Sequence, residues 1–405
     1  MLTETWKKSK IHLKNKSTNL DKSLSISKSF PKIISSLISF ITFVFVLKYL
    51  GKETFANLLV CYSLGSIFLW ITDFGLLRLY IYEFSLQNYE KAKAIWSVRL
   101  ITSCSLSLLL IVLLQVFFES TLTPLIIIAL LDIFTDSYLE TRIINTTNKA
   151  SILLQLIKRV SILTLIILSI TFDFQKSTVV ITSIYLFVCT LIVFLDFVSN
   201  GTLLLSSFKL RYLLDSGRYW IQNAGTYLSN FDIPLISMLF GSEMVIVIST
   251  IRKITAGIAI FGMTTSTLIF SEVAKKPVLE IIKKKIMQTC AYTLLFSILG
   301  ICFTPLIFGL ILQTQLSRSY FEITSVLFIL TPIGVLLSIM NSILLALKKF
   351  TKVTAATFSS SISYLIGIYL FYEFNLHHYA IIIGLFINYG IELFLYTKYL
   401  RNRRD

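Results

Sequence analysis

Residues 30–50 read FPKIISSLISFITFVFVLKYL, and after the short polar link GKET (51–54) residues 55–82 read FANLLVCYSLGSIFLWITDFGLLRLYIY. Each run is long enough to supply the roughly 20 mainly apolar residues that a helix needs to cross a bilayer. The lysine-rich segment before residue 30 is too polar and too long for a cleaved signal peptide. These two runs therefore predict the first two permanent spans of a multi-pass membrane protein.

The composition of the whole chain agrees with this interpretation. Of 405 residues 55% are hydrophobic and only 14% are charged, against roughly 25% charged residues in an average soluble domain. The mean hydropathy is +0.80. So few charged side chains cannot cover the surface of a soluble protein of this size. The composition excludes a soluble enzyme, a nucleic-acid-binding domain and a disordered protein. In a membrane protein the net charge of +16 is expected in the loops and tails rather than on a nucleic-acid-binding surface.

Ten further apolar runs follow the first two, and the loops between them are short. The twelve predicted spans are 30–50, 55–82, 93–118, 121–145, 151–172, 178–206, 216–240, 243–271, 284–312, 321–347, 352–373 and 378–399. Lysine and arginine gather in the N-terminal segment, at the C-terminal end and in every second loop. Because loops rich in Lys and Arg stay in the cytoplasm, both termini are expected to be cytoplasmic.

A weak internal repeat divides the twelve spans into six plus six. Leu50-Gly51-Lys52-Glu53 follows the first span, and Phe240-Gly241-Ser242-Glu243 follows the seventh. The predicted fold is an all-α membrane protein with two six-helix bundles around a central cavity. Its predicted parts are a basic cytoplasmic tail (1–29), an N-terminal bundle (30–206) and a C-terminal bundle with a short cytoplasmic tail (207–405).

Three carboxylates in the fourth span recur every four residues, at Asp132, Asp136 and Glu140. This spacing puts them on one helical face. Since adjacent like charges repel, at least one is expected to be protonated, bound to a cation or paired with a base. Two interpretations stay open: an ion-coupling site that titrates during transport, or a structural stripe neutralised by bases of neighbouring helices, namely Arg78, Arg99 or Arg142.

The eighth span carries two bases, Arg252 and Lys253, roughly 14 Å from its outer edge at 1.5 Å per residue. Neither side chain easily reaches water from that depth. Arg252 is therefore expected either to face a water-filled cavity, where a guanidinium suits a phosphate or pyrophosphate, or to pair with Asp232 or a carboxylate of the fourth span. Asp232 precedes Pro234, which can bend the seventh span beside a carboxylate.

The remaining charges and reactive side chains predict less. Lys158 and Arg159 are expected to extend to the membrane surface, and Asp73 and Asp196 to lie at the cytoplasmic interface. The five cysteines lie in apolar runs without metal-ligand spacing, and the chain contains no GxxxxGK phosphate loop and no GxSxG or HExxH motif. No cofactor, metal site or ATP hydrolysis is expected.

Three short motifs resemble those of bacterial polysaccharide repeat-unit flippases, a family of the multidrug/oligosaccharidyl-lipid/polysaccharide exporter superfamily. YLGKETFA (49–56) is similar to the link between their first two spans, although Ala56 stands where the family usually has Gly. ITDFGL (71–76) is similar to their DFGL element, and LALKKFTK (345–352) to the link before their last two spans.

The resemblance implies a function. It describes a flippase that carries undecaprenyl-pyrophosphate-linked oligosaccharides across the bacterial inner membrane for O-antigen or capsule assembly, by alternating access and coupled to an ion gradient. Membrane lipid and the polymerase and chain-length regulator of the same pathway are its expected partners. The family's use of cavity bases for the pyrophosphate carries over to Arg252.

The remaining site assignments are this sequence's own, and two rival functions stay open. Lys253, Arg78 and Arg99 are further candidates for binding the substrate, and Asp132, Asp136, Glu140 and Asp232 are the candidates for ion coupling. The rivals are a cation-coupled multidrug exporter of the same superfamily and a membrane-embedded glycan polymerase or ligase. The absence of a large polar loop argues against the enzyme.

Overall fold

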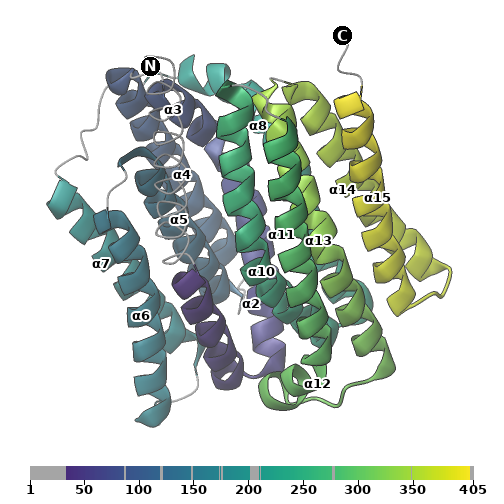
Figure 1. Ribbon diagram of the computed structural model, residues 1–405. Helices are drawn as coiled ribbons and strands as arrows, with labels where there is room; N and C mark the ends of the chain where they lie inside the picture. The colour runs from purple at the N-terminus through teal and green to yellow at the C-terminus, as the bar shows by residue number, and fades with distance from the viewer. Residues whose placement is uncertain are drawn as a thin grey trace, which may run out of the picture.

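The computed structural model describes residues 33–85, 88–118, 122–146, 149–172, 177–200, 211–275, 279–347 and 349–401, together with the single residues 174 and 209. Helices account for nearly all of them, as expected where lipid offers no partners to free backbone N–H and C=O groups. The helices run side by side along one common direction (Figure 1). The predicted basic tail 1–29 lies outside the described residues.

Most helices follow the predicted spans, but the predicted spans 55–82, 216–240 and 284–312 are each divided among two or three elements. The first half contains the helix Ile33–Leu50, α2 (Lys52–Asp73), α3 (Leu76–Ser85), α4 (Tyr89–Phe118), α5 (Thr123–Thr146), α6 (Lys149–Thr171) and α7 (Thr178–Asn200). The second half contains α8 (Arg211–Leu228), the 3-10 turn η1 (Ser229–Phe231), α9 (Asp232–Phe240), α10 (Ser242–Lys275), α11 (Leu279–Cys302), α12 (Thr304–Leu306), the π-helical η2 (Ile307–Leu312), α13 (Arg318–Ala346), α14 (Phe350–Glu373) and α15 (His378–Arg401).

Nine helices of the described part are long and apolar enough to cross a membrane, so the chain is a multi-pass membrane protein, although the predicted number of twelve spans is not confirmed. The other three predicted spans lie over α5, over the segment α8–η1–α9 and over α10. In each of these, some side chains lie outside the described residues.

Two ends of the molecule are distinguished from here on. The outer end carries the short α12, and the inner end carries α3 and the C-terminal end of the chain, as Figure 1 shows. The links that precede α2 and α10 also lie at the outer end. The inner end is the side that the charge distribution of the loops predicts to be cytoplasmic.

The sequence repeat has a structural counterpart at the outer end. Gly51 and Gly241 each separate two helices, with φ of 79° and 82° and ψ of 167° and 179°. This backbone conformation strongly favours glycine. Lys52 follows the first glycine, and its Nζ lies 3.7 Å from Oε1 of Glu243, two residues beyond the second glycine. The two similar turns thus lie next to each other and connect the two halves.

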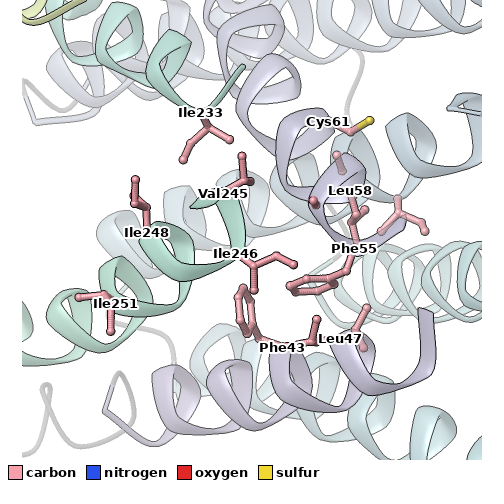
Figure 2. Close-up of a cluster of buried hydrophobic side chains, with 14 of the residues drawn as sticks. Phe43, Leu47, Phe55, Leu58, Cys61, Ile233, Val245, Ile246, Ile248 and Ile251 are labelled. Atoms are coloured by element: carbon pink, nitrogen blue, oxygen red, sulfur yellow. The ribbon is translucent and has the colours of Figure 1, made fainter. Parts of the chain in front are cut away.

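A shared apolar core lies beneath these turns. Phe43 and Phe55 of the first half meet edge to face with ring centroids 4.7 Å apart, and Ile246 of α10 lies beside them in Figure 2. All three belong to one buried cluster that extends through both halves. Because lipid is as apolar as these side chains, close van der Waals packing rather than burial from water holds the halves together near the outer end.

At the inner end α3 packs directly against α8. Gly75, with φ of 75°, lies so close to α8 that a Cβ there would be 2.7 Å from the backbone oxygen of Ser216. Trp70 and Trp220 stack with ring centroids 5.1 Å apart, and each indole N–H donates to the other residue's backbone oxygen, at 3.1 and 3.2 Å. The halves therefore touch at both ends.

The Lys52–Glu243 pair leads to a first prediction. Lys52→Glu places two carboxylates together at the outer end, and we expect this end to separate more often. Both side chains are about half exposed, so the stability should change by no more than about 1 kcal/mol. The measurement is the rate at which a membrane-impermeant maleimide labels a cysteine placed at Thr314, in a chain whose five native cysteines have been replaced.

The control for that experiment is the charge swap Lys52→Glu/Glu243→Lys, which should return the labelling rate to that of the parent chain. Tyr320 donates a hydrogen bond to Glu243 at 3.0 Å, so Tyr320→Phe should raise the rate to a smaller extent. Equal rates in the single and the swapped variants would show that this pair does not hold the outer end closed.

Candidate functional site

A cavity of about 400 Å³ lies in the second half of the molecule. Its walls come from η1, α9, α10, α13, α14 and α15, and many of the lining side chains carry hydroxyl, amide or charged groups. The polar lining includes Asn230, Asp232, Arg252, Thr331, Tyr364 and Asn388. Its volume falls in the usual range of roughly 300–1,000 Å³ for small-molecule sites.

Arg252 forms one wall of this cavity and is bound to Asp232. Its Nη2 donates to Oδ2 of Asp232 and to the hydroxyl of Tyr364 at 3.2 Å. Tyr364 in turn donates to the same carboxylate oxygen at 2.8 Å. The side chain of Arg252 is 35% exposed, whereas that of Asp232 is 1% exposed. Both interpretations of Arg252 therefore describe part of its environment, since it lines a cavity and also pairs with Asp232.

The position of this cavity differs from the prediction. We expected Arg252 to face a space between the two bundles, but every residue that lines this cavity lies between positions 229 and 389. The ion pair explains the difference: α9, which carries Asp232, packs against α10 within the same half, and the guanidinium binds this carboxylate.

A second group of charges lies in the first half and includes two of the three predicted carboxylates. Lys158 of α6 places its Nζ 2.7 Å from Oδ1 of Asp132 and 2.8 Å from Oδ1 of Asp136. Arg159 forms ion pairs with both carboxylates as well. Tyr62 of α2 donates to Oδ2 of Asp132 at 3.0 Å. The carboxylates are thus paired with bases in this state of the protein.

The bases that pair with Asp132 and Asp136 are not those that the sequence predicted. Lys158 was predicted to extend to the membrane surface, yet its side chain is 0% exposed. A lysine this deep is stable only when carboxylates surround it. The sequence contains a signal that could have found the pair, because Lys158 lies in the middle of an apolar run at the depth of Asp132. Hydropathy alone does not show which helix faces which.

None of the three arginines predicted to neutralise these carboxylates is seen to do so among the described side chains. Arg99 pairs with Asp73, donates to the hydroxyl of Ser137 at 2.6 Å and lies over the ring of Trp96. Arg78 is exposed on α3. The side chains of Arg142 and of the third carboxylate, Glu140, lie outside the described residues.

Two further carboxylates, Asp73 and Asp196, have partners within the protein. Asp73 holds Arg99 between α2 and α4. Asp196, expected at the cytoplasmic interface, is fully buried and accepts a hydrogen bond from the hydroxyl of Tyr138. Among the residues that the structure describes, no three His, Cys, Asp or Glu side chains gather in a way that could hold a metal ion.

Lys253 lies between the two charged groups. Its Nζ is 5.8 Å from the centre of the Phe43 ring, so it points from α10 toward the first helix. It interacts electrostatically with Asp132, Asp136 and Arg159. With Lys158 and Arg159 also present, three bases face two carboxylates among the side chains that the structure describes. These described side chains carry an excess positive charge between the halves when all three bases are protonated.

Comparisons with solved structures show which fold places these groups. One similar structure is described as the inward-facing conformation of a multidrug resistance MATE family transporter of the MOP superfamily. Its TM-score is 0.67 at 13% identity, over 92% of this chain and 96% of that chain. The chain has the fold of the MOP-superfamily transporters.

Two other structures agree with this assignment of the MOP fold. The MATE multidrug transporter DinF-BH, solved as a complex, matches with a TM-score of 0.66 at 14% identity, over 93% of this chain and 94% of that chain. The lipid II flippase MurJ in an inward closed conformation matches with a TM-score of 0.63 at 15% identity, over 93% of this chain and 87% of that chain.

Comparisons of the sequence alone do not assign the chain to a family. No family model matches the chain, and no curated protein matches its sequence. At 13–15% identity the fold has kept its helix arrangement while nearly all side chains differ. The function of this chain must therefore be argued from its own charged groups.

Proposed function

We propose that the chain is a flippase for undecaprenyl-pyrophosphate-linked oligosaccharides, moving them from the cytoplasmic to the periplasmic leaflet of a bacterial inner membrane by alternating access. The observation that carries this proposal is the position of Lys253. Its ammonium adds positive charge between the halves, and the next residue of the same helix, Arg252, lines a polar cavity. Such an arrangement suits a substrate that joins an anionic group to a polar head group.

Arg252 and Lys253 are the proposed contacts of the pyrophosphate and sugar head group. Arg78, exposed on α3 near the inner end, is a proposed contact on the way in. Arg99 could contact substrate only after its ion pair with Asp73 opens, so a role for it belongs to another state of the cycle. The polymerase and the chain-length regulator of the same pathway are the proposed protein partners.

Ion coupling is proposed at Asp132, Asp136 and Asp232, with Glu140 as a fourth candidate. In this state bases already neutralise the first three carboxylates. Coupling would therefore need a base to leave its carboxylate while a proton or cation takes its place. Asp136 is the most accessible of the three, with its side chain 29% exposed.

A cation-coupled multidrug exporter is the alternative that the same fold supports, since MATE transporters share it. The two functions differ in the charge of the substrate. A cationic drug would be repelled by the excess positive charge around Lys253, whereas a pyrophosphate would be attracted. Deleting the gene should therefore leave drug sensitivity unchanged, reduce the surface glycan and cause lipid-linked oligosaccharide to accumulate in the cytoplasmic leaflet.

Lys253→Ala should reduce flipping of the lipid-linked oligosaccharide by about tenfold, equivalent to about 1.4 kcal/mol of lost transition-state stabilisation. The reason is the loss of the excess positive charge between the halves. Flipping is measured with purified protein in vesicles, from the protection of the head group against an enzyme added outside. Lys253→Arg should keep most of the activity, because it keeps the charge.

Lys398→Ala, at an exposed position of α15, is the matched control and should flip like the parent chain. Full activity of Lys253→Ala at equal protein levels would remove Lys253 from the proposed site. Drug resistance that depends on this chain, with normal surface glycan after its deletion, would favour the multidrug exporter.

A further inference from the structure

The cavity in the second half has no excess charge, and this property decides what it can hold. The titratable groups that line it are Asp232, Arg252, Tyr364 and Tyr389. Asp232 and Arg252 neutralise each other through a direct ion pair. A pyrophosphate would have to compete with the buried carboxylate of Asp232 for the guanidinium, at a considerable cost in free energy.

The rest of the lining offers neutral hydrogen-bonding groups on several sides. Hydroxyl and amide side chains come from four different elements, and amides and hydroxyls both donate and accept hydrogen bonds. These side chains are Ser229, Asn230, Thr255, Thr331, Ser338 and Asn388. Aliphatic and aromatic surfaces of Leu327, Leu385 and Tyr389 lie between them. A ligand that matches this lining is uncharged, carries many hydroxyl groups and has apolar faces.

Arg252 is oriented for such a ligand by its own ion pair. Its hydrogen bonds to Asp232 and Tyr364 both use Nη2. The guanidinium is thereby fixed in position, and 35% of its side chain remains exposed on the cavity wall. A guanidinium carries five N–H donors in a rigid plane, so an arginine that is held by an aspartate can still donate to ligand hydroxyls.

We propose that this cavity is a binding subsite for uncharged sugar residues of the transported head group, and that the pyrophosphate binds at Lys253 instead. This inference rests on the flippase function proposed above. A volume of about 400 Å³ suits a group the size of a disaccharide.

Helical geometry explains how one segment of α10 serves both parts of the substrate. Successive residues of an α-helix point about 100° apart. Arg252 accordingly faces α9 and α14 within the second half, while Lys253 faces the first helix. The two neighbouring bases thus separate the sugar from the anionic linkage, and the boundary between the subsites lies on α10.

The test uses the full chain in nanodiscs and saturation-transfer NMR with three free sugars: lactose, N-acetyllactosamine and a rhamnose disaccharide. We expect at least one of them to bind, and inorganic pyrophosphate not to displace it. Ala256→Phe should weaken that binding at least tenfold, because Ala256 is an exposed lining residue and a larger side chain there enters the cavity without disturbing packed neighbours.

Two further variants make the test specific. Asn388→Leu keeps the approximate volume of the side chain and removes its amide, so it should weaken binding severalfold even if Ala256→Phe does not fold. Ala355→Phe makes the same exchange at an exposed position of α14 that does not line the cavity, and it should bind sugar like the parent chain.

The outcomes separate this inference from the proposed function. Absence of binding for all three sugars, displacement by inorganic pyrophosphate, or unchanged binding in both Ala256→Phe and Asn388→Leu would overturn the sugar subsite. If the parent chain flips lipid-linked oligosaccharide while any of these results holds, the flippase function stands without the subsite. If the chain binds sugar at this cavity but flips no lipid-linked oligosaccharide, the subsite stands and the flippase function fails.

Discussion

Lys158→Met should destabilise the folded protein by about 3–5 kcal/mol, the usual cost of removing one partner from a buried ion pair. The Lys158 ammonium is completely buried and contacts Asp132, Asp136 and the backbone oxygen of Asp132. Without it, Arg159 keeps its ion pairs with both carboxylates, and Lys253 adds only an electrostatic interaction with them. The measurement is the thermal unfolding midpoint of purified protein in detergent.

A second substitution should reverse much of this loss. Lys158→Met/Asp136→Asn removes one positive and one negative charge, so Asp132 and Arg159 remain as a balanced pair. We expect this double variant to be clearly more stable than Lys158→Met. Because unfolding is measured rather than transport, the result does not depend on whether Asp136 also couples an ion.

The matched control is Lys93→Met, which removes a lysine whose ion pair with Glu90 is exposed to solvent. It should change the stability by less than about 1 kcal/mol. Equal effects of Lys93→Met and Lys158→Met, or a failure of Asp136→Asn to restore stability, would contradict the structural role assigned to Lys158.

Gly75→Ala should prevent the inner end from closing as it does here. Alanine is strained at a φ of 75°, and its Cβ would overlap the backbone of α8 at Ser216 and Trp220. Backbone atoms cannot rotate away as a flexible side chain could, so α3 and α8 must separate. We expect flipping to fall at least tenfold and the reactivity of a cysteine placed at Tyr219 toward a maleimide to rise.

Gly217→Ala is the control for this effect, because a Cβ on Gly217 of α8 would meet nothing within 4 Å. In the interior of a helix alanine is favoured over glycine by roughly 1 kcal/mol, so this variant should be slightly more stable and fully active. Normal flipping by Gly75→Ala would show that close packing of α3 on α8 is not part of the transport cycle.

Much of the fold followed from local properties of the chain. A membrane span is identified by the summed hydropathy of about 20 consecutive residues, so the runs around Phe43 and Phe55 predicted helices without knowledge of their neighbours. The turns at Gly51 and Gly241 were visible as a sequence repeat, and their matching φ and ψ angles confirm it locally. The depths of Asp132 and Arg252 could also be counted along the helices.

The partners of these charges depended on tertiary structure. Lys158 and Arg252 both lie deep in apolar runs, yet the first neutralises Asp132 and Asp136 while the second lines a cavity beside Asp232. Depth along a helix follows from the sequence, whereas the direction in which a side chain points depends on helix rotation and bending. The packing of α9 against α10, which brings Asp232 to Arg252, is such a feature.

The sequence by itself thus determined that this is a helical multi-pass membrane protein with costly charges at the centre of its helices. Only the tertiary structure decided which charges cancel and which face an open space. The physical reason is that hydropathy adds up residue by residue along one helix, while an ion pair or a cavity exists only between side chains of different helices.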